Sequence, residues 1–310
     1  MTVLHDNPAV VVLGGGTGLA TLLSGLKHHT SKLTAVVTVA DDGGSSGRLR
    51  REMSIQPPGD IRNCLVALAE DESLMGELFQ YRFEEGPLSG HSFGNLFLAA
   101  LTRVTGDFEE AVLQSSKILK TRGAVLPASP DLVSLKAELD DGSLVEGQSA
   151  IASSNRACRR VWLKPETARP TAAVLEAIAG ADIIVAGPGS LFTSIIPNLL
   201  IGAIAEAVAA TDCRKVFVCN VMTQPGETVG FSAADHLEVL VAHTQPGIVD
   251  RVIVNTVEPP APVVEFYRAK GALPVVIDED RLGALGREVL FAEVASGGNY
   301  FRHASGNLAA

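Results

Sequence analysis

The sequence has few aromatic residues and few cysteines, and it carries no excess of positive charge. Aromatic residues make up 5% of its 310 residues. The cysteines, Cys64, Cys158, Cys213 and Cys219, form no CxxC pair, and no histidine cluster completes a zinc pattern, which favours reduced, buried thiols over a metal site. The formal net charge of −10 gives no general attraction for nucleic acid or for anionic membranes. Any anionic ligand must therefore be bound locally, by backbone N–H groups and a few placed cations.

Long hydrophobic runs are also lacking. The longest apolar stretch, around residues 199–210, is interrupted by Glu206 and predicts a buried helix that is too short to cross a bilayer. The first ten residues, MTVLHDNPAV, lack the basic segment and the apolar run of a signal peptide. We therefore expect a cytoplasmic protein with no membrane insertion and no nucleic-acid partner.

Core-forming residues are plentiful by contrast, since hydrophobic residues make up 46% of the chain. A chain of this length buries roughly three quarters of its unfolded surface and folds without disulfides or a structural metal. Apolar runs typical of strands alternate with helical patterns, and they predict strands at 9–13, 33–40, 181–186, 215–221, 249–255 and 274–278. This alternation predicts a three-layer, Rossmann-like α/β fold with a doubly wound, mostly parallel sheet.

The middle of the chain interrupts this alternation. Residues from about 74 to 119 have the three- and four-residue spacing of helices. The segment LVSLKAELDDGSLVEGQSAI alternates on both sides of Asp141-Gly142, which predicts a β-hairpin. We expect a single α/β domain over residues 1–310, with a helical and β-hairpin insertion around 72–160.

Two glycine-rich loops that follow predicted strands are suited to an anion. They are LGGGTGL at 13–19 and AGPGS at 186–190, and each precedes a predicted helix. Glycine lets the backbone approach a phosphate closely, and a helix N-terminus offers free N–H groups. Neither the dinucleotide fingerprint nor the P-loop pattern fits, because Leu19 stands in the third glycine place and no GK[ST] follows. The ligand-binding residues predicted here are Gly15, Gly16, Thr17, Gly18, Gly189 and Ser190.

A third loop, ADDGGSSGRLR at 40–50, carries a pair of carboxylates. Asp41 and Asp42 directly follow a predicted strand, where they can grip a ribose hydroxyl, coordinate Mg²⁺ or act as a base. An Asp-Gly pair is equally typical of a simple turn. Ser45, Ser46 and Arg48 add hydroxyl groups and a cation that suit a phosphate.

Two segments in the first half add further candidates. In PPGDIRN, Asp60 is either an N-cap or a functional carboxylate, while Arg62 and Asn63 fall in the first helical turn, where they can face an anion. In GHSFGN, His91 and Asn95 share one face if the segment is helical. His91 is also an acid–base candidate, although a histidine at a helix start is more often a structural residue.

The loop CNVMTQPGET follows the predicted strand at 215–221. Its Asn220, Thr223 and Gln224 are uncharged and provide both donors and acceptors, which suits a nucleobase or a sugar better than a metal. Ser190 lacks the GxSxG setting of a hydrolase nucleophile. Ligand binding is therefore favoured over covalent catalysis at both loops.

Taken together, these segments resemble a known family. LGGGTGL, TVADDGGSSGRLR, PPGDIRNCL, LFQYRF, GHSFGNLFLAAL, AGPGSLFTSIIPNLL, CNVMTQPGET and the late Arg-His pair look like those of the YvcK-type gluconeogenesis factors, within the wider CofD-like group. The resemblance runs from about Val10 to His303. It implies a cytoplasmic protein that is linked to growth on gluconeogenic carbon sources, cell shape and cell-wall synthesis, and that binds UDP-N-acetylglucosamine. Tyr267 and Arg302 resemble the residues with which the family closes on the uridine diphosphate.

Two functions remain open on this resemblance. The first is a non-catalytic UDP-sugar-binding regulator without a certain cofactor or metal, which works as a homodimer with regulatory protein partners or a kinase. The alternative is a transferase like CofD, which joins a phospholactyl group to a deazaflavin precursor. In that case Asp41, Asp42 or Asp60 holds Mg²⁺ or deprotonates the acceptor. The segments GGSSGRLR and GHSFGN match the YvcK type rather than CofD, which favours the regulator. An NAD-dependent oxidoreductase is disfavoured by the broken fingerprint.

Overall fold

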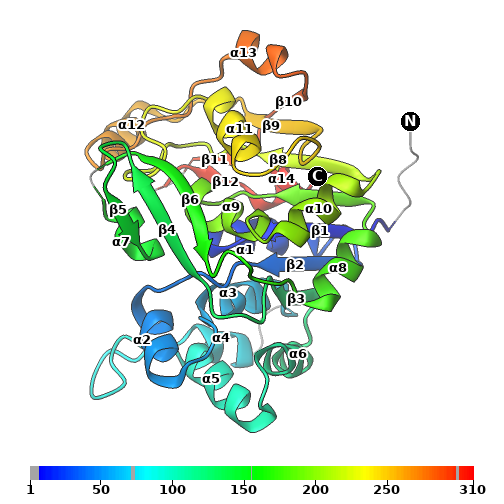
Figure 1. Ribbon diagram of the computed structural model, residues 1–310, viewed down its shortest axis with the longest axis vertical. Helices are drawn as coiled ribbons and strands as arrows, with labels where there is room; N and C mark the ends of the chain where they lie inside the picture. Colours follow the sequence, from blue (N-terminus) through cyan, green and yellow to red (C-terminus); the bar gives the residue numbers. More distant parts are fainter. Residues whose placement is uncertain (1–6, 71–73, 155, 298–299) are drawn as a thin grey trace.

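Seven parallel strands form one sheet, which runs through the centre of the molecule (Figure 1). The computed structural model describes residues 7–70, 74–154, 156–297 and 300–310. The first six residues, in which no signal peptide is expected, and residues 72–73 and 155 of the expected insertion lie outside these ranges. The sheet has the order β10-β9-β8-β7-β1-β2-β3, and each neighbouring pair is parallel. Its strands are β1 (Val10–Gly14), β2 (Leu33–Val37), β3 (Ala124–Pro127), β7 (Ile183–Ala186), β8 (Arg214–Val218), β9 (Arg251–Asn255) and β10 (Glu288–Ala292).

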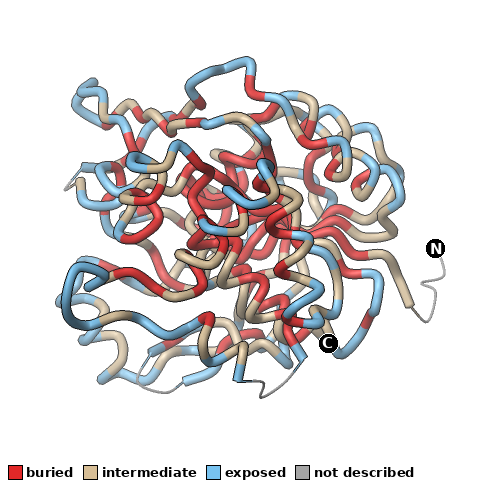
Figure 2. Tube along the Cα trace, turned by 90° about the horizontal axis from the view of Figure 1, so that it is seen from below, coloured by how far each residue is buried: buried red, intermediate tan, exposed pale blue. Residues whose placement is uncertain are grey.

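The central strand β1 is buried on both faces, as its unbroken Val/Leu run predicts. Side chains alternate along a strand, so Val11 and Leu13 join one hydrophobic cluster while Val10 and Val12 join another. Figure 2 shows these buried segments in red through the middle of the molecule. Each cluster lies between one face of the sheet and the helices that pack on it, so the sheet has a helical layer on both sides. This confirms the predicted three-layer, doubly wound fold.

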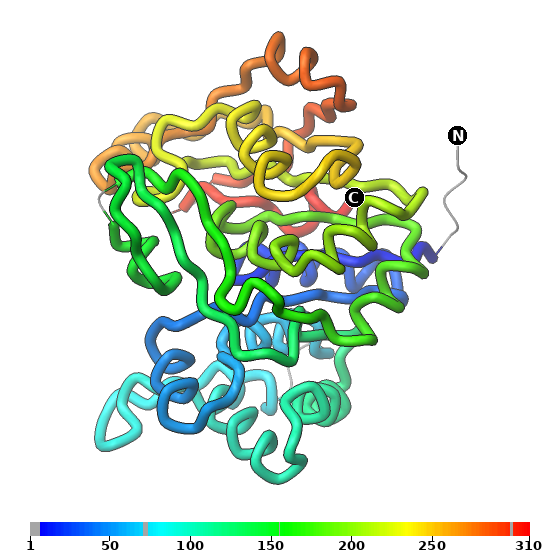
Figure 3. Tube along the Cα trace, in the orientation of Figure 1, coloured from blue at the N-terminus to red at the C-terminus, as the bar shows by residue number. Residues whose placement is uncertain are grey.

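Helices from different parts of the chain build the two outer layers. One cluster contains residues of α8 (Ala172–Ala179), α9 (Ile196–Leu199), α10 (Gly202–Ala210) and α11 (Ala233–Ala242). The other contains residues of α1 (Gly16–Leu26), α3 (Gly59–Leu68), α5 (Phe93–Thr105), α6 (Phe108–Leu119) and α14 (Ser305–Ala309). The C-terminal helix α14 thus returns to pack on α1, which lies near the start of the chain (Figure 3).

The segment 72–160 contains both local structure and a strand of the central sheet. Its first three helices are α4 (Leu74–Gln80), α5 and α6, which lie with α2 (Gly44–Met53) at one end of the molecule (Figure 1). The predicted hairpin is confirmed by the antiparallel pair β4 (Ser134–Leu139) and β5 (Leu144–Glu146), which gains a third strand, β6 (Cys158–Lys164). The short α7 (Gln148–Ala152) follows β5. Between α6 and the hairpin, β3 pairs with β2 at the edge of the central sheet.

The strand predicted at 274–278 is wrong. This segment makes only isolated bridges, from Pro274 to Met222 and from Val276 to Ser232. Pro274 has no N–H to donate, while the N–H of Val275 and the carbonyl of Val276 bond to the loop after β8 and to the start of α11. The edge strand is β10 instead, and the minor pair β11 (Ala295–Ser296) and β12 (Arg302–His303) follows it.

The helix predicted around 199–210 is confirmed over Gly202–Ala210, but the structure breaks the chain just before it. A π-helical turn, η1 (Leu191–Ile195), runs into α9, and α10 starts afresh at Gly202 after a 75° bend. Pro197 lies in the first turn of α9, where a missing N–H is tolerated. Across the described ranges no helix alone has the length and hydropathy to cross a membrane. The η1–α9 and α10 pieces reach that threshold only when they are counted together across the bend.

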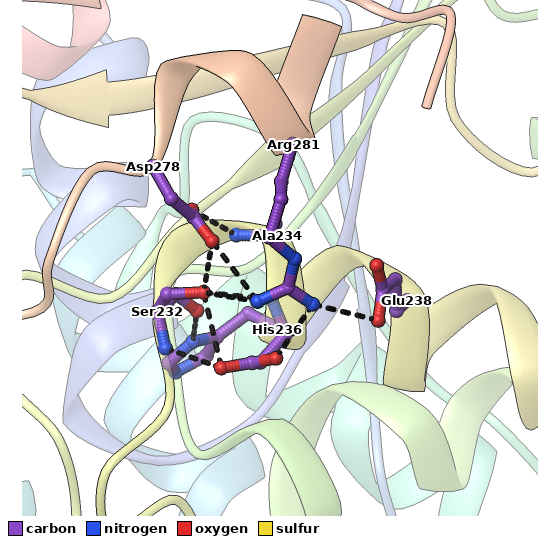
Figure 4. Close-up of polar contacts among 7 residues, drawn as sticks. Ser232, Ala234, His236, Glu238, Asp278 and Arg281 are labelled. Atoms are coloured by element: carbon purple, nitrogen blue, oxygen red, sulfur yellow. Dashed lines mark hydrogen bonds and ion pairs between the residues drawn. The ribbon is translucent and has the colours of Figure 1, made fainter. Parts of the chain in front are cut away.

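A polar network fixes the end of the 274–278 segment to α11 (Figure 4). Ser232 and Asp235 form a capping box at the start of α11, and Asp278 Oδ1 accepts a hydrogen bond from the Ala234 N–H at 3.0 Å. Arg281, on α13 (Glu279–Ala284), pairs with Asp235 at 2.9 Å and with Glu238 at 3.0 Å. The chain between β9 and β10, including α12 (Ala261–Arg268), is therefore anchored at its C-terminal side.

Candidate functional site

A cleft of about 540 Å³ lies where the chain order of the strands reverses. Strands β1, β2 and β3 succeed one another in one direction, whereas β7 to β10 run outward from the other side of β1. Ligands of doubly wound proteins sit at this reversal, beyond the carboxyl ends of the strands. The volume is within the usual range for small-molecule sites. Eleven of the residues predicted to bind a ligand line the cleft: Gly15, Gly16, Thr17, Gly18, Gly189, Ser190, Asn220, Thr223, Gln224, Tyr267 and Arg302.

The two glycine loops meet at the floor of the cleft. A Cβ atom on Gly18 would lie 2.6 Å from the carbonyl oxygen of Pro188, so only glycine permits this contact. Gly16 adopts a φ of +66°, which also favours glycine. The N-cap of α1 is Gly15, which has no side chain to satisfy the first N–H groups of the helix. The Gly16 backbone bonds to Asp60, so the donors that the first turn of α1 presents to the cleft are the N–H groups of the next residues, Thr17 and Gly18.

Uncharged side chains form one wall of the cleft. Gln224 Nε2 donates to Ser190 Oγ at 2.8 Å, and Asn220 Nδ2 donates to Gln224 Oε1 at 3.4 Å. Thr223 bonds to the chain after α12 instead of to this wall. Its N–H donates to the Leu273 carbonyl, and its Oγ1 accepts from the Leu273 N–H. Thr223 thus holds the segment that follows α12 against the cleft.

The C-terminal part of the chain covers the cleft. Tyr267 Oη donates to the Phe301 carbonyl at 3.2 Å, which joins α12 to the last strand pair. Arg302 lies 4.8 Å from the centre of the Tyr300 ring. His303 Nε2 lies 3.2 Å from the Cys219 carbonyl, and burial lowers the pKa of His303 to about 4. His303 is therefore neutral at physiological pH and acts as a fixed polar group.

Several cleft residues have no local sequence signal. Lys270 lies just beyond α12 and gives the cleft a second cation beside Arg302. It was missed because only folding brings the chain after β9 over the β1 loop. The other lining side chains outside the prediction include Thr21, Gln148, Ser194, Phe301 and His303.

Glu227 is another residue that sequence reasoning missed. It is 2% exposed and accepts hydrogen bonds from the Phe192 N–H at 3.3 Å and from Thr193 Oγ1 at 3.0 Å, at the start of η1. Burial raises the pKa of Glu227 to about 7, against the lowering effect of these bonds and of Ser190. The carboxyl group thus supports the loop that carries Ser190, behind the wall of the cleft.

The remaining predicted site residues lie outside the cleft, in a second polar group around α2 and α3. Its internal contacts include Ser45 Oγ with His91 Nδ1 at 2.9 Å and the Gly59 N–H with Ser46 Oγ at 3.1 Å. The residues placed here are Asp41, Asp42, Ser45, Ser46, Arg48, Asp60, His91 and Asn95, whereas Asn63 lines a separate cavity along α1. The sequence predicted one site, whereas the structure divides its residues among the cleft, this polar group and that cavity.

Two local expectations in this group are corrected. His91 and Asn95 do not share a helical face, because α5 starts at Phe93 after its N-cap Ser92, whose Oγ accepts from the Asn95 N–H. Asp60 is not an N-cap, because Pro58 has that place and α3 starts at Gly59. The Asp60 carboxylate instead bonds to the backbone of Gly16.

The Asp41-Asp42 pair is divided by the fold. Asp42 Oδ1 accepts from the Ser149 N–H at 2.8 Å and so caps α7. Asp41 Oδ1 accepts from the Gly43 N–H at 2.9 Å. Burial, together with the charge of Asp41, raises the pKa of Asp60 to about 6, and burial also raises the pKa of Asp41. Asp41 thus lies near enough for its charge to act on Asp60, whose carboxylate stands directly behind the Gly15–Gly16 turn.

No group of three or more metal-ligating side chains occurs in the part of the chain that the structure describes. Two carboxylates nevertheless fit Mg²⁺, which is commonly held by one or two carboxylates together with substrate phosphates. Asp60 Oδ2 is buried without a hydrogen-bond partner among the described residues. Asp41 and Asp60 are therefore the residues that would hold such an ion.

A doubly wound sheet with a glycine-floored cleft at its strand reversal defines a Rossmann-like α/β protein. The sequence model of one such family, described as 2-phospho-L-lactate transferase CofD, matches residues 10–295. The chain belongs to this CofD family, as its motifs predicted.

Curated relatives and solved structures agree with this assignment. The chain is 53% identical to a gluconeogenesis factor of Halalkalibacterium halodurans over 279 residues, which cover 89% of this chain and 86% of the relative. It is 49% identical to the gluconeogenesis factor of Bacillus subtilis, with 94% and 93% covered. A crystal structure of a Bacillus halodurans protein matches with a TM-score of 0.96 at 48% identity, over 98% of both chains.

The buried Glu227 predicts a specific pH dependence of stability. Its folded pKa of about 7 lies above its ordinary value of 4.5, so the folded state keeps a proton that the unfolded state releases between these values. Stability therefore falls as the pH rises through this window. Glu227→Gln removes this titration. In urea unfolding, the free energy of unfolding of this variant should therefore fall less between about pH 5 and about pH 8 than that of the wild type. The difference is about 1.4 kcal/mol for each unit by which the pKa is raised.

The matched control is Glu84→Gln, which removes the same charge from an exposed position. It should keep the wild-type pH dependence. If the free energy of unfolding changes equally with pH in the wild type and in Glu227→Gln, a protonated Glu227 in the folded protein is contradicted.

Proposed function

We propose that this protein binds UDP-N-acetylglucosamine in the cleft and acts as a non-catalytic regulator. The processes regulated are cell-wall synthesis, cell shape and growth on gluconeogenic carbon sources. The names of the curated relatives support the last of these. The observation that carries the proposal is the charge of the cleft: none of its described lining residues is acidic, although the chain has a net charge of −10.

Each part of the cleft suits one part of a nucleotide sugar. The N–H groups of the α1 first turn and the Gly189 loop suit the diphosphate, which the cations of Lys270 and Arg302 also attract. The amides of Asn220 and Gln224 suit the polar edges of a base or sugar. The Tyr267 ring offers an aromatic surface close to Arg302.

Regulation requires that the ligand favour one state of the protein over another. Helix α12 is the element suited to this, because none of its residues is buried. Its contacts to the cleft run through Tyr267 and the segment held by Thr223. We propose that ligand binding changes this surface for a partner, which is a regulatory protein or a kinase, and that the protein acts as a homodimer.

Calorimetric titration tests the ligand. UDP-N-acetylglucosamine should bind the purified protein, and Arg302→Gln should weaken binding by about tenfold, which corresponds to the loss of about 1.4 kcal/mol from one charged contact. Arg268→Gln is the matched control, because Arg268 is exposed on α12, pairs with Glu265 and does not line the cleft. Absence of binding at millimolar ligand, or binding of NAD alone, would contradict the proposal.

A CofD-like, Mg²⁺-dependent transferase is the second candidate, and the Asp41–Asp60 pair favours it. The ion would stabilise the developing charge of a transferred phosphoryl group. Asp60 stands behind the Gly15–Gly16 turn, where a Cβ atom on Gly15 would lie 2.7 Å from Asp60 Oδ2. The Asp60 carboxylate is therefore next to the place proposed for the diphosphate.

Mass spectrometry of the ligand separates the two candidates. Under the regulator proposal, UDP-N-acetylglucosamine remains intact after incubation with the protein and Mg²⁺, and Asp60→Asn changes nothing in the products. Turnover that Asp60→Asn abolishes while calorimetry still shows binding would establish the transferase instead.

A further inference from the structure

A second cavity of about 390 Å³ adjoins the cleft along α1. The two share Thr17 and Thr21, so they open on neighbouring faces of the same helix. The other walls of the second cavity come from α3 and from the chain at the end of α4. We call it the arginine cavity, because Arg62 on α3 and Arg82 after α4 both line it.

The charges of the two arginines are not balanced by ion pairs among the described residues. Arg62 Nη2 donates to Asn63 Oδ1 at 2.6 Å, and Arg82 Nη1 donates to the Gly90 carbonyl at 2.7 Å. The Arg62 Nε atom is buried without a hydrogen-bond partner among those residues. Arg62 and Arg82 line the same cavity, so their like charges repel each other and a bound anion would relieve that repulsion.

The stem of Arg62 is held in place by the start of α5. A Cβ atom on Gly94 would lie 2.9 Å from both Cγ and Cδ of Arg62, so glycine at this position lets the stem lie directly on the helix. The same atom would also lie 2.7 Å from the Phe79 carbonyl. A guanidinium with a fixed stem loses little conformational freedom on binding a ligand.

Polar groups complete the wall of the cavity. Because Asn63 Oδ1 already accepts from Arg62, the amide N–H groups of Asn63 are what this side chain can offer to a ligand. Gln80 adds a second amide, and Thr17 and Ser24 also line the cavity, although the Ser24 hydroxyl already donates to the Thr21 carbonyl at 2.8 Å. None of the described lining residues of this cavity is acidic.

We propose that the arginine cavity binds a phosphomonoester or inorganic phosphate, at a site separate from the cleft. A phosphate group carries up to two negative charges and enough oxygens to accept from two guanidinium forks at once, whereas a carboxylate satisfies one. Because the two sites share the first turns of α1, each ligand should change the affinity for the other by the same factor. The inference concerns phosphate binding itself and does not depend on the identity of the ligand in the cleft.

The experiment is calorimetric titration of the full chain with inorganic phosphate and, separately, glycerol 3-phosphate, in a phosphate-free buffer at low salt. Binding should be one to one, and Arg62→Gln and Arg82→Gln should each weaken it by about tenfold or more. Arg159→Gln is the control, because that arginine is 71% exposed on β6 and lies far along the chain from the cavity. It should bind like the wild type.

A second titration places the site relative to the cleft. Both arginine variants should keep affinity for UDP-N-acetylglucosamine within about threefold, and phosphate should still bind in the presence of saturating nucleotide sugar. Arg82 is exposed, so its variant tests the site even if Arg62→Gln unfolds. The proposal is overturned if phosphate fails to bind at about 10 mM, if the arginine variants bind it unchanged, or if UDP-N-acetylglucosamine displaces it competitively. Failure of UDP-N-acetylglucosamine to bind would overturn the regulator proposal and leave the phosphate result intact.

Discussion

The close contact between the loops after β1 and β7 is the constraint on which the rest of the site depends. Gly18 packs against the Pro188 carbonyl with no room for a side chain. Asn198, fully buried on α9, fastens the same place by donating from Nδ2 to the Gly14 carbonyl at 3.1 Å and to the Ser194 carbonyl at 2.8 Å. This contact orients α1 so that its N-terminus points to the cleft, where the chain order of the strands reverses. It also fixes the wall that Ser190 and Gln224 form above it.

Electrostatics divide the surroundings of the cleft into layers. The inner surface carries backbone donors, amides and the cations of Lys270 and Arg302. The carboxyl groups of Asp60 and Glu227 stand behind that surface, where burial raises their pKa to about 6 and about 7. Buried carboxyl groups with raised pKa values carry less negative charge near neutrality than exposed ones. An acidic protein can in this way support its loops with acids and still present an attractive surface to an anion.

Local sequence patterns predicted the parts of the fold that depend on local physics. The valine run of β1 indicated a strand buried on both faces, and the glycine loops indicated where the cleft would lie. The segment 274–278 misled because an apolar run with a proline can equally form bridges along loops, while β10 is a partly exposed edge strand with a weak pattern. Asp42 looked like half of a functional pair until the fold brought α7 within reach of its carboxylate. Segments distant in the chain form the surroundings of Lys270, Glu227 and Arg82, so no local pattern could identify these residues.

The most direct test of the account is a crystal structure of the protein with UDP-N-acetylglucosamine. The account predicts the diphosphate on the N–H groups of the α1 first turn and the Gly189 loop, with the nucleoside between Tyr267 and Arg302. A nucleotide sugar bound at any other surface, or with its diphosphate between Arg62 and Arg82, would contradict it.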